Sequence, residues 1–232
     1  MGIFTRKPAA TIDEPATEPT EPTDPTPAPT PAGTVSLSKG ASTGINLTKT
    51  DPALQITAHL DWDGGTASRQ ARGADLELYI LYVPRENVGT AANTIGNAVY
   101  YNSLGHLDRP PFIRHHGDSL IPGRETATIG RLDQQGYALV CAYSAVGNGV
   151  GSFKSFGAQA IVTDGAGQTV TVPLYDDNPN AYWVAIALVD FTGDGAVIRQ
   201  VEQYSRPNSE SRPVLYADGL VVMDAGPIEF KR

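Results

Sequence analysis

Oxygen-bearing side chains recur at the ends of apolar runs in the first half of this 232-residue chain. They come from four segments: Trp62-Asp63, Gly73-Ala74-Asp75-Leu76-Glu77-Leu78, Tyr101-Asn102-Ser103 and Gly117-Asp118-Ser119-Leu120. Calcium takes about six to eight oxygen ligands, at roughly 2.3–2.6 Å, from carboxylates and neutral carbonyl groups. If loops at strand ends gather these segments, their oxygens could converge on one hard cation.

A single calcium-binding loop does not explain these residues. Asp61-Trp62-Asp63-Gly64 begins like an EF-hand loop, but the twelfth position is Arg72, where that loop needs a bidentate glutamate. The helices that flank an EF-hand loop are also absent from the sequence pattern. Any calcium site in this chain is therefore built from segments that lie far apart in the sequence.

The order of these motifs resembles the bacterial tellurium-resistance (TerD-like) family of stress-response proteins. The resemblance runs from about Val35 to Tyr204, with Val35-Ser36-Leu37-Ser38-Lys39-Gly40 at the start of the domain. Tyr79 stands where the family has the third carboxylate of its acidic stretch, and Ser103 stands where it has a second asparagine. The family consists of calcium-binding β-sandwiches, so the resemblance implies that fold and Ca²⁺ as a cofactor.

By this resemblance, the calcium ligands are four carboxylates and one neutral oxygen, from Asp63, Asp75, Glu77, Asp118 and Asn102. The chain departs from the family after Asp118, where the family has a glycine-rich acidic stretch. Here Ile121 to Thr126 follow, with Arg124 beside the single carboxylate of Glu125. An arginine repels a cation and competes for nearby carboxylates. Two alternatives stay open: one retained calcium site, or a vestigial site that has only structural hydrogen bonds.

The resemblance implies a non-enzymatic role, as a binding or scaffolding module in the response to tellurite or to general stress. The alternative is a calcium-independent interaction domain that assembles with protein partners or with itself. A hydrolase is the third class, because Gly40-Ala41-Ser42-Thr43-Gly44 has the spacing of a nucleophile elbow. That motif needs a helix after it, whereas the β-like residues Ile45 to Thr48 follow, so we expect no catalytic site.

Composition argues against several other classes. The formal net charge of −8 and the pI of about 4.9 oppose a nucleic-acid footprint. No run reaches the ~18 apolar residues of a membrane span. The stretch from Met1 to Lys7 lacks the apolar core of a signal peptide. A cytoplasmic protein without an integral membrane segment is therefore expected.

Short runs rich in Val, Ile and Tyr predict an all-β fold. The expected strands span residues 54–60, 76–83, 137–143, 158–163, 169–174, 183–191 and 197–204. Asp-Gly pairs at 164–165, 194–195 and 218–219 predict hairpin turns. This pattern of short strands and tight turns is typical of a two-sheet β-sandwich. One weak helix is expected over residues 90–98, and a hairpin over 214–223 is followed by an extended C-terminal arm that can add to a sheet edge.

Residues 1–33 are expected to form a tail, and residues 34–232 to form the β-sandwich domain. Seven prolines between Pro15 and Pro31 are interspersed with Thr, Glu, Asp and Ala. Such a segment has too little apolar surface to offset the entropy lost on ordering. The composition therefore predicts a disordered, Pro/Thr/Glu-rich spacer that the domain does not need for folding.

The remaining reactive side chains are one cysteine and four histidines. Cys141 lies in an apolar run, which favours a buried structural thiol over a metalloid-reactive one. His115 and His116 are adjacent, and neighbours on a strand face opposite sides of the sheet. We therefore expect solvated loop histidines and no zinc site.

Overall fold

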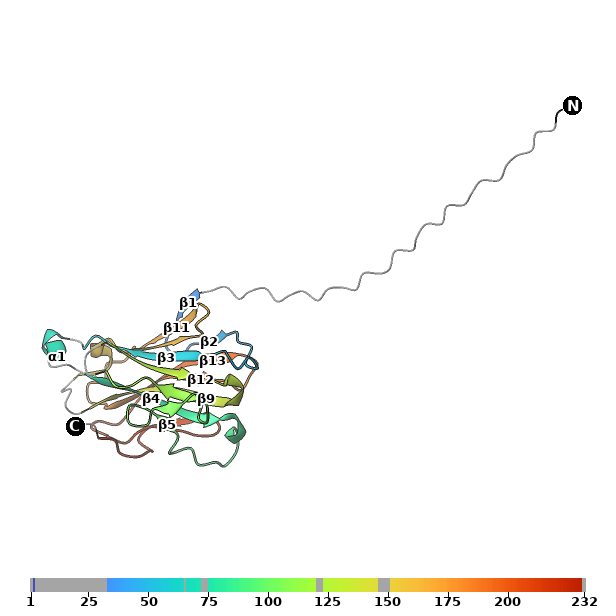
Figure 1. Cartoon of the computed structure of the whole chain (residues 1–232). Helices are drawn as coiled ribbons and strands as arrows, with labels where there is room; N and C mark the ends of the chain where they lie inside the picture. The colour runs from blue at the N-terminus through green and yellow to red at the C-terminus, as the bar shows by residue number, and fades with distance from the viewer. Residues whose placement is uncertain are drawn as a thin grey trace. The chain divides into compact units, whose positions relative to one another are not determined.

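The computed structural model describes residues 2, 33–64, 66–71, 75–119, 123–145 and 151–230 (Figure 1). The chain divides into two units, Met1–Thr30 and Pro31–Arg232. Apart from Gly2 and Gly33, the expected tail lies outside the described residues, and strand β1 begins at Gly33. In the described part of the chain, no helix is long and apolar enough to cross a membrane.

Two large β-sheets make up the second unit, which confirms the predicted all-β sandwich. Sheet A has the order β1-β11-β10-β3-β8-β7-β6. Its strands are β1 (Gly33–Ser36), β11 (Gln168–Pro173), β10 (Gln159–Thr163), β3 (Ile56–Asp61), β8 (Arg124–Ile129), β7 (Ile113–His115) and β6 (Gly105–His106). Strands β1 and β11 pair in parallel, and the other neighbours in sheet A pair antiparallel.

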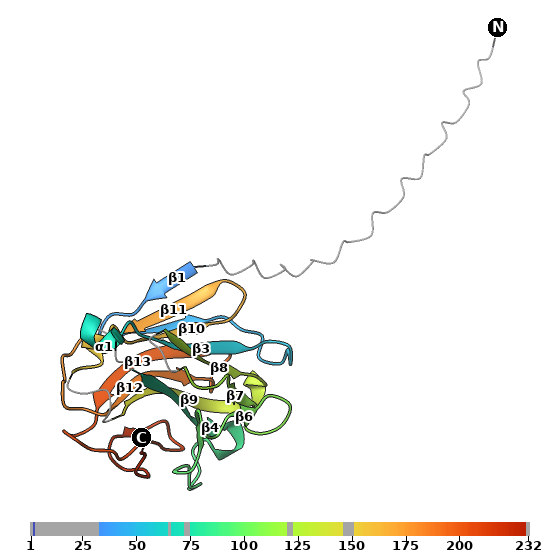
Figure 2. The same cartoon turned by 60° about the vertical axis from the view of Figure 1, so that its left-hand side comes forward.

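Sheet B has the order β2-β13-β12-β9-β4-β5 and is antiparallel throughout. Its strands are β2 (Ser42–Ile45), β13 (Ala196–Tyr204), β12 (Trp183–Asp190), β9 (Gln135–Ser144), β4 (Leu76–Pro84) and β5 (Ala98–Val99). Figure 2 shows the layer of β1, β11, β10 and β3 above the layer of β12, β9 and β4. Short helical segments are α1 (Ala67–Ala71), η1 (Arg85–Asn87), η2 (Leu132–Gln134) and η4 (Lys154–Phe156).

All seven predicted strands are present, with their ends displaced by at most two residues. The three Asp-Gly pairs lie between β10 and β11, between β12 and β13, and between β14 (Val214–Leu215) and β15 (Val221–Val222). The helix expected over residues 90–98 is wrong, because this segment is irregular, with one turn at Ile95 and Gly96, until β5 begins. The backbone N–H of Ala92 donates to Thr90 Oγ1 and that of Ile95 to Asn93 Oδ1. Such local bonds compete with helical ones.

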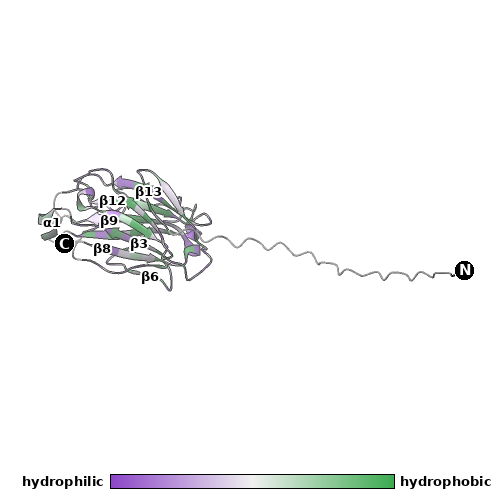
Figure 3. Cartoon of the chain, turned by 90° about the horizontal axis from the view of Figure 1, so that it is seen from above, coloured by the Kyte–Doolittle hydropathy of each residue, from purple (hydrophilic) through white to green (hydrophobic). Residues whose placement is uncertain are grey.

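The main hydrophobic core lies between the two sheets. It includes Leu60 of sheet A and Leu78, Ile80, Val140 and Ile186 of sheet B, all fully buried. Strand β3 alternates buried and half-buried residues along its length, as a strand with one face on a core should. In Figure 3 the hydrophobic colour is concentrated on central strands such as β3, β9 and β12.

A second hydrophobic cluster covers the opposite face of sheet B. Tyr79, Tyr143 and Trp183 form its aromatic part, with the ring centroids of Tyr143 and Trp183 4.7 Å apart. Residues 205–230, which we call the C-terminal cap, place Leu215 of the β14–β15 hairpin against these rings. Figure 2 shows this part of the chain in red beneath the layer of β12, β9 and β4. The predicted hairpin is thus confirmed, and it covers the second hydrophobic cluster.

The expected C-terminal arm folds back on the same domain. A β-bridge joins Ser211 to Ile228, and the backbone N–H of Gly226 donates to Arg212 O at 2.8 Å. The backbone N–H of Glu229 likewise donates to Glu210 O at 3.1 Å. The arm therefore pairs through its backbone with residues 210–212 of the same cap.

Cys141 lies in the second cluster and is fully buried, and burial raises the pKa of its thiol. We expect a chromogenic disulfide reagent to label it only after the protein unfolds, because the thiolate is the reactive form. A thiol pKa raised above its unfolded value of about 8.5 stabilises the fold below that pH. This contribution should be lost progressively at higher pH. Rapid labelling of the native protein at neutral pH would contradict this assignment.

Candidate metal centre

Three carboxylates from two distant segments meet near the start of β4. Asp75 directly precedes the strand, Glu77 is its second residue, and Asp118 is the third residue after β7. One oxygen from each carboxylate lies within 4.8 Å of the other two. Asp75 and Glu77 share a face because side chains alternate along an extended chain. Glu77 is buried, Asp75 is half-buried and Asp118 is exposed, so the group runs from the interior to solvent.

Glu125 of β8 ties together the two segments that carry these carboxylates. Its Oε2 accepts the backbone N–H of Leu78 at 2.6 Å, and its Oε1 accepts that of Ser119 at 3.0 Å. These two amides directly follow Glu77 and Asp118 in the chain. Glu125 is only 2% exposed, and short bonds to a carboxylate are among the stronger hydrogen bonds in proteins. Glu125 is thus a positioning residue that joins sheet A to sheet B beside the three carboxylates.

His115 lies beside Glu125 inside the sandwich. Its Nε2 lies 3.5 Å from Glu125 Oε2, and both side chains are fully buried. Its Nδ1 accepts the backbone N–H of Gly117 at 3.1 Å, which assigns the ring proton to Nε2, facing Glu125. The expectation of solvated loop histidines is wrong for this residue, because the alternation of β7 turns His115 inward.

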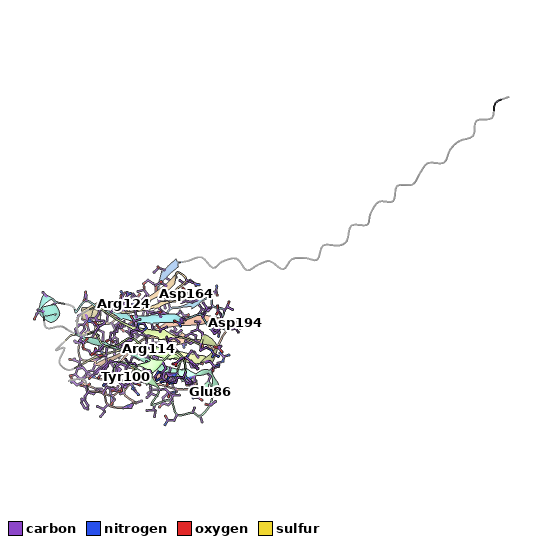
Figure 4. The ribbon with its side chains drawn as sticks, in the orientation of Figure 1. Glu86, Tyr100, Arg114, Arg124, Asp164 and Asp194 are labelled. Carbon is purple, nitrogen blue, oxygen red and sulfur yellow. The ribbon has the colours of Figure 1, made fainter. Side chains whose placement is uncertain are left out.

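Arg124, which the sequence places next to the acidic residues, is engaged by Asp61. Its Nε and Nη2 donate to the two oxygens of Asp61 at 2.5 and 2.6 Å (Figure 4 labels Arg124). Asp61 and Arg124 are directly opposite each other on β3 and β8. The hydrogen bond with Asp61 raises the pKa of the Arg124 guanidinium. The Asp61 carboxylate therefore pairs with the Arg124 guanidinium, which was expected to compete with a cation for the acidic residues.

The other two predicted ligands lie outside the group of three carboxylates. Asp63 donates its backbone N–H to Phe156 O at 2.8 Å. Its carboxylate lies against Gly157, where an added Cβ would come within 2.9 Å of the carboxyl carbon. Asn102 is exposed in the tight turn between Tyr100 and Ser103, whose backbones exchange hydrogen bonds of 3.0 and 2.9 Å. Residues 72–74 and 120–122 of the same motifs lie outside the described residues.

The donor set of Asp75, Glu77 and Asp118 suits a hard divalent cation. All three ligands offer carboxylate oxygen, which calcium and magnesium prefer, whereas zinc sites are built mainly from cysteine and histidine. Three carboxylates at this spacing repel one another when ionised, and a cation between them would remove that repulsion. Backbone carbonyls and water would complete a calcium shell of about six to eight oxygens.

No family model and no curated protein matches the chain. Among solved structures, the chain is similar to the crystal structure of SAV2460, a protein of unknown function. The two share 10% sequence identity with a TM-score of 0.43, over 66% of this chain and 91% of that one. A likeness this distant identifies neither a family nor a function. The chain is thus a two-sheet β-sandwich with an acidic cluster at one end of β4.

Proposed function

We propose that this chain is a cytoplasmic, TerD-like protein that binds one calcium ion and serves as a binding or scaffolding module in bacterial stress and tellurium resistance. The observation that carries the proposal is the meeting of Asp75, Glu77 and Asp118 within 4.8 Å. The resemblance of the sequence motifs to that family supplies the biological role. In this proposal the protein has protein partners and no catalytic site.

A cation at this position would join the two sheets. Asp75 and Glu77 belong to the start of β4 in sheet B, whereas Asp118 follows β7 of sheet A. Glu125 already holds the neighbouring backbone amides of both segments, so little reorganisation is needed to close a ligand shell. Binding only to the folded state stabilises it by RT ln(1 + [L]/Kd). Calcium should therefore raise the melting temperature of the domain.

The Asp75→Asn variant tests the site directly. Asparagine keeps a carbonyl oxygen but removes one negative charge, so we expect calcium affinity to fall by at least about tenfold. The variant should fold without calcium, because it loses one member of a repelling group. Isothermal calorimetry and thermal melting with and without calcium measure both effects.

The matched control for this test is Asp177→Asn, which alters an exposed aspartate outside the group. It should bind calcium as the wild type does. If the wild type gives no heat at millimolar calcium, the group is not a calcium site. The stress role needs its own test: growth on tellurite of cells in which the wild type or Asp75→Asn replaces the deleted gene.

The second candidate function is a calcium-independent interaction domain. The observation in its favour is the exposure of two large apolar side chains at the end of the C-terminal cap, Ile228 at 60% and Phe230 at 71%. Exposed apolar side chains two residues apart in the chain suit a protein partner or a second copy of the chain. The calcium titration above separates the two candidates, because only the first requires a bound cation.

A further inference from the structure

A cavity of about 250 Å³ lies at the far end of β4 from the acidic cluster. It is bounded by the end of β4, by η1, and by the loops that carry Asn97 and Phe112. At roughly 3.3 Å per residue, the length of β4 separates it from Asp75 by about 25 Å. Figure 4 labels Glu86, which lines the cavity, at the lower right and Arg124 at the upper left. The cavity is thus independent of the proposed calcium site.

The lining of this cavity combines aromatic rings with neutral amides. Tyr82 and Phe112 supply the rings, and Asn87, Asn97 and Gln134 are among the residues that supply side-chain amides. Glu86 is the one charged side chain among the described lining residues. A neutral lining with a single carboxylate disfavours phosphate or carboxylate ligands, which need cationic or backbone N–H donors.

Several polar groups of the lining are available to a ligand. Within the described part of the chain, the side chains of Tyr82, Asn87 and Asn97 form no hydrogen bond with the protein. Tyr82 is half-buried, and this burial raises the pKa of its hydroxyl. A few convergent polar groups in a concave, partly aromatic surface are the usual form of a small-molecule site.

The wall formed by Phe112 is held in a strained conformation. Its φ is +58°, which is unusual for a bulky side chain. Phe112 donates its N–H to Arg109 O at 2.9 Å and accepts the N–H of Gly130 at 2.8 Å. The Arg131 guanidinium lies 5.4 Å from the centre of the Phe112 ring, within cation–π range. Backbone strain of this kind concentrates at ligand sites, where the surrounding structure fixes the conformation in advance.

We infer that this cavity binds a neutral, hydroxyl-rich ring of the size of one sugar residue. Sugar hydroxyls both donate and accept hydrogen bonds, and so do side-chain amides and the tyrosine hydroxyl. The C–H face of a pyranose ring is apolar and packs on aromatic faces such as those of Tyr82 and Phe112. The volume lies below the range of about 300–1,000 Å³ that drug-sized ligands occupy, so the ligand is one small ring or the end of a chain.

The test is a titration of the full-length protein with the methyl glycosides of glucose, galactose, mannose and N-acetylglucosamine, followed by ¹H–¹⁵N NMR. At least one glycoside should shift the amides of Asn87, Asn97 and Phe112 at millimolar concentration, with or without calcium. Tyr82→Phe removes only the hydroxyl and should weaken binding about three- to tenfold. Tyr182→Phe is the control, because its hydroxyl bonds to Asn208, outside the cavity lining.

Asn87→Ala provides a second variant, on the short helix η1, if Tyr82→Phe disturbs the strand. The proposal is overturned if no glycoside shifts these amides, or if the shifts persist at the same affinity in both variants. A proline-rich peptide also has flat apolar rings. If such a peptide shifts the same amides and no glycoside does, the cavity is a peptide site and the sugar assignment is wrong.

Discussion

Replacing Arg212 with methionine is expected to destabilise the domain by about 3–5 kcal/mol. Its Nη1 donates to Glu229 Oε1 at 3.1 Å, and the two side chains are 5% and 16% exposed. Its Nη2 donates to Ile95 O at 2.8 Å, so one side chain ties the cap to the loop before β5. Methionine fills similar space but leaves a largely buried carboxylate without its cation. That uncompensated charge is the main source of the loss.

The C-terminal cap should loosen in this variant. Besides Arg212, the cap is held by Tyr143, whose hydroxyl donates to Glu210 Oε2 at 2.6 Å, and by Thr94, whose hydroxyl donates to Leu215 O at 2.6 Å. We expect the melting temperature to fall by roughly 6–20 °C for a domain of this size. The readouts are thermal melting and the rate at which Cys141, beneath the cap, becomes reactive.

Two further variants keep this prediction testable. Arg109→Met removes an exposed pair with Asp108, 3.6 Å apart, and should cost less than about 1 kcal/mol. Arg212→Met combined with Glu229→Leu should recover much of the loss, because replacing both partners of a buried pair by apolar groups is often neutral. A loss of less than about 1 kcal/mol in Arg212→Met would show that the pair does not hold the cap.

Lowering the pH should reduce the loss of stability that Arg212→Met causes relative to the wild type. Burial raises the pKa of the Glu229 carboxyl, and Arg212 counters that effect. A raised carboxyl pKa means that the folded state binds more protons than the unfolded state above about pH 4.3, so stability falls as pH rises through the folded value. Without Arg212 the pKa should rise further. The difference between variant and wild type should therefore be largest at neutral pH and shrink toward about pH 4.

The strands could be predicted because apolar runs are short and Asp-Gly pairs mark turns between them. Asp164-Gly165 and Asp194-Gly195 each connect two long strands, and the structure has hairpins at both. The second hydrophobic cluster could not be predicted in the same way. The near-continuous apolar runs of β9 and β12 indicate burial on both faces, but nothing local says what covers the second face. The answer depends on residues 205–230, which are separated from β9 by strands β10 to β13 in the chain order.

The acidic cluster could also be predicted only in part, from local features of the sequence. Asp75 and Glu77 share a face by strand alternation, and Asp118 belongs to another motif that carries oxygen ligands. Neither strand alternation nor the presence of the second motif predicts that Asp118 lies close to Asp75 and Glu77. That depends on how β8 of sheet A packs against β4 of sheet B, which places Glu125 within hydrogen-bonding distance of the Leu78 amide. The sequence signal for Glu125 was that it is the carboxylate remaining after Asp118. Its position between the two sheets depends on tertiary packing, which that signal does not give.

The second large effect is expected for Glu125→Gln, which changes one buried carboxylate by a single atom. The carboxylate accepts two backbone N–H groups, from Leu78 and Ser119. The glutamine side chain has one acceptor oxygen, so its NH₂ must face one of these two N–H donors. A hydrogen bond to a charged group contributes about 1.5–3 kcal/mol. Losing one and weakening the other should destabilise the domain by about 2–4 kcal/mol.

The same substitution should weaken the proposed calcium binding, although Glu125 is not among the three clustered carboxylates. Outer residues that orient metal ligands typically change affinity by about 10–100-fold. Glu86→Gln is the matched control, because it neutralises an exposed glutamate at the other end of β4. Urea unfolding and calorimetry measure the two effects separately. Unchanged stability would show that the two amides do not depend on Glu125, whereas lost stability with unchanged affinity would mean that it supports the fold without positioning Glu77 and Asp118.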